Sequence, residues 1–141
     1  MGTERLWRPY LCECRICLEK PVQEQSAVRS DREQSCSSYR KEIIVPANWK
    51  GKEIFAHFGS VTSNMYLWVN GRYVGYSEDS KLEAEFNLTS YLKPGKNVIA
   101  FQVFRWCDGS YLEDQDFFRY SGVGRNCYLY ARDKKYIQDI R

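Results

Sequence analysis

The chain has 141 residues and a formal net charge of +3, and aromatic residues make up 16% of it. This length is enough for one domain with a modest hydrophobic core. The charge is too small and too evenly spread to indicate nucleic-acid binding, and no apolar run is long enough to cross a membrane. The N-terminus lacks the apolar core of an export signal, so we expect a cytoplasmic protein.

The segment 1–37 differs in character from the rest of the chain. Its second half is almost entirely polar and has the period of neither a helix nor a strand. Such a segment buries too little apolar surface to offset its ordering entropy, so we expect residues 1–37 to be disordered or irregular. Four cysteines lie here, namely Cys12, Cys14, Cys17 and Cys36. Zinc sites usually pair two C-x2-C knuckles, and only one such pair is present, so the spacing argues against zinc.

From Ser38 onward, short strand patterns alternate with turn signals. The predicted strands are residues 38–46, 53–59, 65–69, 72–76, 98–106 and 127–131, and residues 86–92 fit either a short strand or a helical turn. In the second strand, Ile54, Ala56 and Phe58 share one face. Short strands at this spacing predict an all-β fold, a β-sandwich.

Two turns and one strand are the clearest local signals. Asn70-Gly71 between two strand patterns predicts a tight hairpin, because both residues tolerate positive φ. Residues 93–96 (K-P-G-K) predict a turn. The strand 98–106 is nearly continuously apolar, which is typical of a central strand buried on both faces.

The stretch 105–121 (R-W-C-D-G-S-Y-L-E-D-Q-D-F-F-R-Y-S) carries the most chemistry. Its four carboxylates are Asp108, Glu113, Asp114 and Asp116. A loop this rich in acids and aromatics either presents side chains to a ligand or is structural, with its acids capping amides or pairing with Arg105 and Arg119. The residues alone leave both interpretations open.

The remaining reactive side chains do not form a nucleophilic site. His57, the single histidine, alternates with apolar neighbours and is expected to be a packed strand residue rather than a catalyst. Cys107 and Cys127 lie apart from other cysteines among aromatic residues. Without an export signal, we expect both to be buried or half-buried free thiols.

Three strings together resemble the N-terminal sugar-binding domain of glycoside hydrolase family 2, in its large β-galactosidases. They are F-G-S-V-T-S-N-M-Y-L-W-V-N-G-R-Y-V-G-Y-S-E-D-S-K-L, A-E-F-N-L-T-S-Y-L-K-P-G-K-N and R-W-C-D-G-S-Y-L-E-D-Q-D-F-F-R-Y-S-G. The resemblance covers about residues 38–141. It implies a jelly-roll sandwich of the galactose-binding-domain type at 38–133, followed at 134–141 by the start of a linker to a further domain.

The resemblance also implies roles for particular residues. The last aspartate of D-Q-D, here Asp116, helps to hold a sodium ion and the C6 hydroxyl of the sugar. Glu78 and Asp108 match positions of a peripheral magnesium. Hard cations prefer oxygen ligands, which carboxylates supply. The catalytic glutamates of the family lie on a separate barrel domain, so we expect no catalytic residue in this chain and no ion bound by it alone.

The chain departs from the family pattern in two places. Phe118 stands where tryptophan is usual, and Gly124 and Asn126 are also atypical, which affects local packing and leaves Asp116 in place. The segment before Ser38 lacks the family's usual text. However, codons compatible with Trp7–Lys20, read one base later, can spell G-D-L-I-Y-V-N-V-G-Y-A-W-K-N. Our hypothesis is that residues 1–37 are a frameshifted translation, in which the family's pocket asparagine is lost near Glu13.

The sequence therefore predicts part of a β-galactosidase: a non-catalytic domain that acts with the other domains of its parent chain on a β-galactoside. The alternative is a free-standing carbohydrate-binding module that uses exposed tryptophan and tyrosine. A zinc- or nucleic-acid-binding protein would depend on the N-terminal segment alone. No interaction with a membrane is expected.

Overall fold

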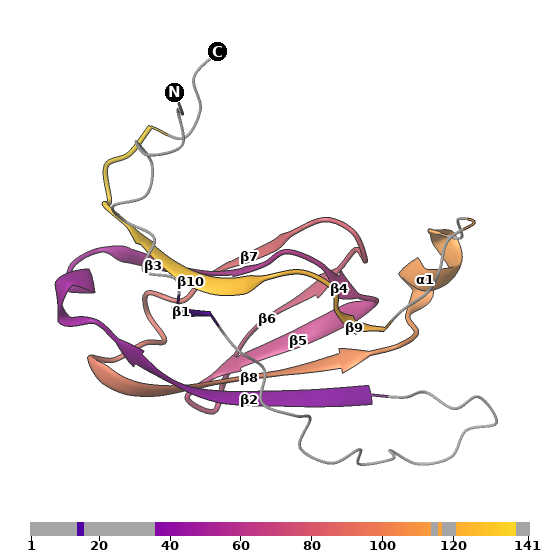
Figure 1. Ribbon diagram of the computed structural model, residues 1–141, viewed down its shortest axis with the longest axis horizontal. Helices are drawn as coiled ribbons and strands as arrows, with labels where there is room; N and C mark the ends of the chain where they lie inside the picture. The colour runs from indigo at the N-terminus through magenta and orange to yellow at the C-terminus, as the bar shows by residue number, and fades with distance from the viewer. Residues whose placement is uncertain (1–13, 16–35, 114–115, 117–120, 138–141) are drawn as a thin grey trace, which may run out of the picture.

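The computed structural model describes residues 14–15, 36–113, 116 and 121–137, in which two four-stranded antiparallel sheets face each other (Figure 1). The first sheet has the order β1 (Cys14–Arg15), β10 (Cys127–Arg132), β3 (Glu53–Phe58) and β7 (Ala84–Asn87). The second has the order β2 (Cys36–Val45), β8 (Gly95–Phe104), β5 (Asn64–Val69) and β6 (Arg72–Glu78). The predicted all-β sandwich is confirmed.

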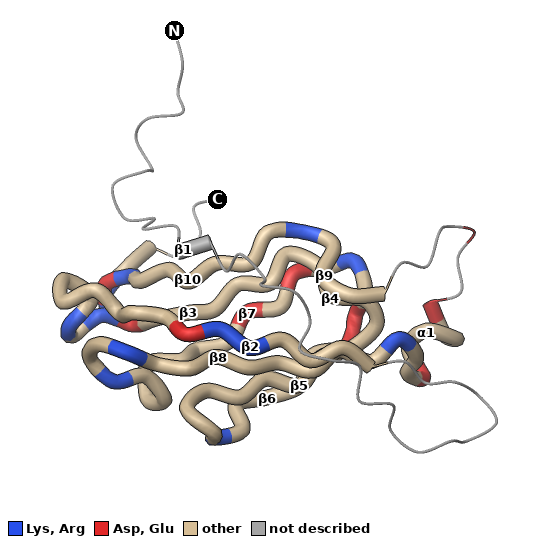
Figure 2. The backbone as a smooth tube through the Cα atoms, turned by 60° about the horizontal axis from the view of Figure 1, so that its bottom comes forward, with Lys and Arg blue, Asp and Glu red and all other residues tan. Residues whose placement is uncertain are grey.

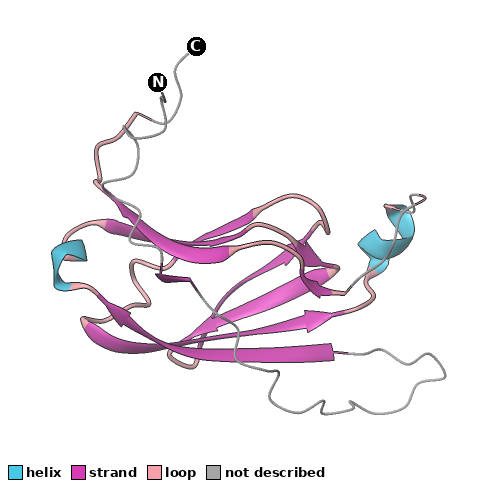
Figure 3. Cartoon of the chain, viewed as in Figure 1, coloured by secondary structure: helices cyan, strands magenta, loops and turns pink. Residues whose placement is uncertain are grey.

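Three smaller elements complete the described chain. They are the two-stranded ladder of β4 (Val61–Thr62) and β9 (Gly122–Val123), the 3-10 helix η2 (Ala47–Trp49) and the helix α1 (Asp108–Leu112). The two helices lie at opposite ends of the sandwich (Figure 3). β5 starts at Asn64 beside Phe104, the last residue of β8 before α1, and ends at Val69 before the β5–β6 hairpin. The helix α1 and this hairpin therefore lie at opposite ends of the sheet.

The core lies between the two sheets. Ile54, Ala56 and Phe58 of β3 are all buried, as the alternation predicts. The Phe58 ring meets the edge of the Phe101 ring on β8, with centroids 5.2 Å apart, so one aromatic pair joins the sheets. Aromatic pairs with this geometry add to the stabilisation from buried area.

β8 is central in its sheet, between β2 and β5, but the prediction that both its faces are buried is wrong. Ile99, Phe101 and Val103 are buried, whereas the alternate residues, such as Ala100 and Gln102, are only half-buried. One face of an antiparallel sheet can border solvent, and here the outer face has no second layer among the described residues. The apolar composition of β8 did not indicate that one of its faces would be buried and the other only half-buried.

The β5–β6 hairpin turns at the predicted residues, with φ of 51° at Asn70 and 79° at Gly71. The Asn70 amide donates to Tyr91 O and to Asn97 Oδ1, and its own Oδ1 accepts from the Val98 amide. Asn97 is 1% exposed and also bonds to Lys93 and Gly95. This network fastens two turns together at the end of the sandwich opposite α1.

The strand boundaries differ slightly from the prediction. β2 begins at Cys36, β6 extends to Glu78, and β8 runs from Gly95 to Phe104, so the turn 93–96 is shorter than expected. Residues 86–92 combine both predicted forms, because β7 ends at Asn87 and turn residues follow. Most of segment 1–37 lies outside the described residues, and the divisions at 37 and 134 stay predictions.

Basic side chains are dispersed over the described fold. Figure 2 shows them on both sheets and on several turns, with acidic residues among them. A nucleic-acid surface would require a concentrated basic stripe. The described residues therefore give no support to that function.

Candidate functional site

The acidic stretch after β8 begins with a short helix that the sequence analysis did not predict. The helix α1 starts after Cys107, whose amide donates to Ser110 Oγ at 3.2 Å, while the Ser110 amide donates back to Cys107 O at 3.1 Å. Reciprocal bonds of this kind satisfy amides that the first turn leaves without partners. At the other end, the Glu113 amide donates to Gly109 O and closes the helix.

Asp116 lies beyond α1 and is exposed. No hydrogen bond or ion pair engages it within the described ranges. An exposed carboxylate without such a partner keeps its acceptor lone pairs available for a ligand. Asp114, Phe118 and Arg119, to which the sequence analysis also gave roles, lie outside the described residues.

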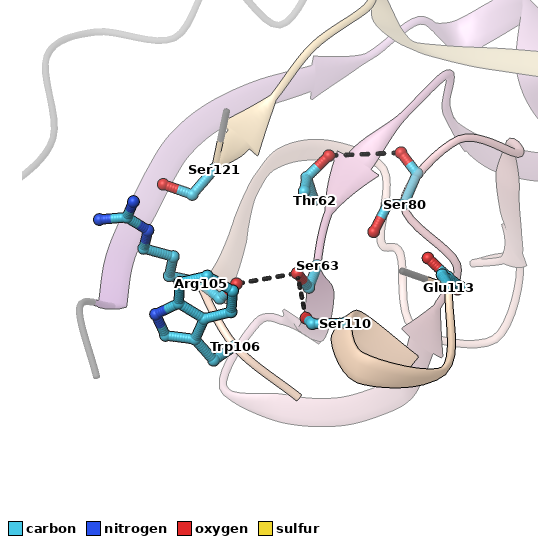
Figure 4. A pocket seen from close by; sticks show the side chains of 8 residues that line it. All are labelled: Thr62, Ser63, Ser80, Arg105, Trp106, Ser110, Glu113 and Ser121. Carbon is cyan, nitrogen blue, oxygen red and sulfur yellow. Dashed lines mark hydrogen bonds between the residues drawn. The ribbon is translucent and has the colours of Figure 1, made fainter. Parts of the chain in front are cut away.

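A small cavity of about 20 Å³ with a mainly polar lining lies beside the helix, and hydrogen bonds among its lining residues hold the helix in place (Figure 4). It is lined by Thr62, Ser63, Ser80, Arg105, Trp106, Ser110, Glu113 and Ser121. Ser110 Oγ donates to Ser63 Oγ at 2.7 Å, and Ser63 Oγ donates to Arg105 O at 2.8 Å. A polar space of this size can hold about one water molecule. The residues that line the cavity thus connect α1 to the start of β5, and the cavity itself is too small for a sugar.

Glu78, at the end of β6, bonds directly to the start of α1. Its Oε1 accepts from the Gly109 amide at 2.7 Å, and its Oε2 accepts from the Tyr76 hydroxyl at 2.6 Å. These donors stabilise the carboxylate, so the pKa of Glu78 falls to about 2, mainly through Tyr76, then through Cys107 and Gly109. Burial and the neighbouring Glu78 raise the pKa of Tyr76.

The sequence-predicted pair Glu78 and Asp108 does meet in space. With Cys107 they offer three ligand atoms that lie within 4.8 Å of one another. Magnesium is often held by one or two carboxylates with waters completing the octahedron, so the two acids fit this ion. The thiol does not, because sulfur is a soft ligand and burial raises the pKa of Cys107, which keeps it protonated.

Gly109 is the residue here that sequence reasoning missed. A Cβ at this position would stand 2.5 Å from Glu78 Oε1, so only glycine allows the carboxylate to approach the helix this closely. The Asp108-Gly109 dipeptide was a visible turn signal. Its partner Glu78 lies 31 residues earlier in the chain, so no local signal indicated that the two residues would meet.

Other candidate residues have structural roles. His57 is half-buried, bonds through Nδ1 to Glu85 Oε1 at 3.1 Å and stacks on Tyr128 with centroids 4.5 Å apart. It is therefore a packed strand residue, as predicted. Cys107 and Cys127 are free thiols, half-buried and buried respectively, which confirms their predicted state, and burial raises the pKa of Cys127 to about 11.

The two atypical positions after β9 also have backbone roles. The Gly124 amide donates to Ser60 O at 3.0 Å, and Asn126 O accepts from the Gly59 amide at 3.1 Å. Of the N-terminal cysteines, Cys36 is the one whose side chain the structure describes, and its sulfur accepts from Gln102 Nε2. The helices in the described ranges are too short or too polar to span a membrane.

Comparison with known proteins adds a family to this geometry. Residues 16–133 match the family described as glycosyl hydrolases family 2, sugar binding domain. A β-galactosidase of Priestia megaterium is 48% identical over 102 residues, which is 72% of this chain and 10% of that protein. A β-galactosidase of Aeromonas hydrophila is 46% identical over 114 residues, which is 80% of this chain and 11% of that protein.

Solved structures agree on the fold. A β-glucuronidase of an uncultured Clostridium species superposes with a TM-score of 0.67 at 27% identity, over 84% of this chain and 23% of that one. The chain spans about a tenth of the length of the curated relatives named above.

Proposed function

This chain belongs to glycosyl hydrolase family 2, and on that premise we propose that it is part of a β-galactosidase, an enzyme that hydrolyses terminal β-D-galactosides. In this proposal the chain is a non-catalytic domain that scaffolds the enzyme and contributes Asp116 to the substrate pocket. The relatives from Priestia megaterium and Aeromonas hydrophila are β-galactosidases, which supports this proposal. A free-standing module is not favoured, because those relatives contain the matching segment within a much longer chain.

The described acids do not suit glycoside hydrolysis by this chain alone. That reaction needs two carboxyl groups on opposite sides of the bond, one of them with a raised pKa so that it can donate a proton. Glu78 has its pKa lowered to about 2 and both oxygens hydrogen-bonded, so it is ionised and cannot act as the acid. Glu113 and Asp116 share one short segment. The catalytic pair therefore has to come from elsewhere in the parent enzyme.

The single observation that carries the proposed role of Asp116 is its exposed carboxylate beyond a firmly anchored helix. Hydrogen bonds that Gly109 and Ser110 of α1 donate to Glu78 and Ser63 hold the helix, while Asp116 itself is not engaged by any described residue. A carboxylate supplies both negative charge and lone pairs to a sodium ion and accepts a hydrogen bond from a sugar hydroxyl. By helping to hold a sodium ion beside the sugar, Asp116 would orient the substrate through the sugar's oxygen atoms.

Magnesium at Glu78 and Asp108 is the second proposed ion site. Its proposed role is to reinforce the junction between β6 and α1, because both acids lie at that junction. We expect the isolated chain to bind neither ion tightly. A cytoplasmic location and a galactoside as the specific partner also belong to this proposal.

A chimera tests the proposed function. Residues 38–133 replace the matching segment of the Priestia megaterium β-galactosidase, and hydrolysis of a nitrophenyl β-galactoside is measured with and without sodium. Asp116→Asn should lower kcat/KM by about a hundredfold, in line with the loss of a charged transition-state contact, and should abolish the sodium dependence. Glu83→Gln, an exposed acid on another loop, is the matched control. An Asp116→Asn chimera with unchanged kcat/KM and sodium response would refute the proposal.

A further inference from the structure

The segment that follows β10 is fastened to the outer face of the first sheet. The ladder of β10 with β3 ends at the pair of Arg132 and Glu53. Because Ala131 is buried in the core, the Arg132 side chain projects from the opposite face of the sheet. The chain bends at residues 134–135, after which the Tyr136 ring contacts Arg132. This segment leaves the sandwich at the end that carries η2, opposite α1 (Figures 1 and 3).

The Arg132 guanidinium contacts two aromatic rings from distant parts of the chain. Its Cζ atom lies 4.0 Å from the centre of the Phe55 ring and 3.8 Å from the centre of the Tyr136 ring. An aromatic face attracts a cation, and the planar guanidinium can also stack on it. Phe55 is buried and stacks on Tyr130 with centroids 5.4 Å apart, so this ring is a fixed support. Tyr136 therefore packs on a cation that the sheet already holds.

Two ion pairs accompany these ring contacts. Arg132 Nε donates to Glu53 Oε2 at 3.4 Å, and Lys52 Nζ lies 3.2 Å from Asp133 Oδ1. Isolated surface pairs contribute little to stability. Here both pairs join the start of β3 to the same short segment that Tyr136 holds from its other end. The contacts therefore reinforce one another in restricting where the chain can go after β10.

These contacts form a unit that we call the exit clamp, which consists of Lys52, Glu53, Phe55, Arg132, Asp133 and Tyr136. We propose that the exit clamp holds the chain as far as Tyr136 and fixes the direction in which it continues. The next side chain, Ile137, is 78% exposed, so the described residues do not hold the chain beyond Tyr136. A linker would then begin after Tyr136, and not at residue 134 as the sequence indicated.

The consequence for a longer enzyme rests on the proposed function, whereas the exit clamp itself does not. Domains that are joined by a flexible linker move relative to each other by default. A chain that is held up to its last contact offers a shorter free linker, and a shorter linker permits fewer arrangements of the next domain. The clamp would thereby restrict how this sandwich is presented to the domain that follows it in the parent chain.

Limited proteolysis of the 141-residue chain with an endoprotease that cleaves after lysine tests the proposal. Lys134 and Lys135 lie inside the clamped segment, and cleavage there requires the segment to leave the sheet. Tyr136→Ala should accelerate cleavage at these two bonds by about two- to fivefold, the equivalent of one exposed cation–π contact. Arg132→Gln removes the cation without adding a cleavage site and should have a similar effect. Mass spectrometry of the released C-terminal peptide measures the rate.

Two variants serve as matched controls. Tyr136→Phe keeps the ring and should leave the cleavage rate unchanged. Tyr111→Ala removes an exposed ring on α1, at the other end of the sandwich, and should also leave it unchanged. Substitution of Tyr136 also alters the sequence that the protease reads. Each rate is therefore divided by the rate for the same variant unfolded in urea.

A second readout reports the ring contact directly. Aromatic ring currents shift the NMR signals of the Arg132 side-chain protons, and Tyr136→Ala should reduce this shift while Tyr136→Phe preserves it. If the isolated chain does not fold, the proteolysis is carried out on the Priestia megaterium chimera, extended from residue 133 to residue 137. Normalised cleavage rates of Tyr136→Ala and Arg132→Gln that equal the wild-type rate overturn the proposal. Since cleavage is measured without any galactoside, failure of the exit clamp is distinguishable from failure of the proposed function.

Discussion

The two ends of the sandwich use polar residues in opposite ways. At the hairpin end, Asn97 is 1% exposed and its amide is bonded to two turns. At the α1 end, Asp116 is exposed and no described residue bonds to it. Glu78 stands between these extremes, half-buried and bonded twice. Polar groups that satisfy the backbone are needed for folding, whereas polar groups left open are available for ligands.

Removing Asn97 should have the largest effect on stability. Asn97→Ala removes the partner of the Lys93 amide, Lys93 O and Gly95 O and one of the two partners of the Asn70 side-chain amide, in a part-buried network. Such unsatisfied groups cost on the order of 3 kcal/mol of unfolding free energy together. Urea unfolding followed by circular dichroism measures this, and a loss under about 1 kcal/mol would show that the network is not essential.

Glu78→Gln should have an intermediate effect that depends on pH. The folded-state pKa of Glu78, about 2, lies below its ordinary value of 4.5, so the carboxylate stabilises the fold above pH 4.5 and this contribution disappears as pH falls toward 2. Since the group is half-exposed, screening reduces the contribution to about 1 kcal/mol.

The check on Glu78 is a comparison of the wild type with Glu78→Gln at pH 6 and at pH 3. The difference in unfolding free energy should shrink as the pH falls. A difference that stays constant would mean that the charge of Glu78 does not contribute.

Gly109→Ala should cost slightly less. The added Cβ would stand 2.5 Å from Glu78 Oε1, so the carboxylate has to swing away and lose its bond to the amide. We expect a loss of roughly 0.5–1 kcal/mol, the net value of one part-buried hydrogen bond. In Glu78→Gln the same glycine change should cost less, which a double-mutant cycle measures; additive effects would show that the two residues are not coupled.

Asp116→Asn should have the smallest effect on stability. Exposed residues without partners usually change the unfolding free energy by less than about 0.5 kcal/mol. Thermal unfolding of the variant should therefore match that of the wild type, although the chimera loses activity. A clear loss of stability would assign Asp116 a structural role instead and remove the contrast between the two ends.

Several features were predictable because their causes are local. Asn70-Gly71 fixes a hairpin through the backbone freedom of two adjacent residues, and the alternation of Ile54, Ala56 and Phe58 reports one buried face of one strand. The exposed aspartate of the D-Q-D string was identified by its resemblance to a family and not by physics. Its function is still a proposal.

What the tertiary structure alone decided depends on residues far apart in the chain. The sequence signals of β8 did not show that only one of its faces would be covered, because that depends on which sheet lies opposite. The contact of Glu78 with Gly109 joins the end of β6 to a helix 31 residues later. The alignment of Arg40, Ala100 and Trp68 across three strands arises from strand register between segments 32 to 60 residues apart. Register is set by the packing of the whole core, so no short segment contains it.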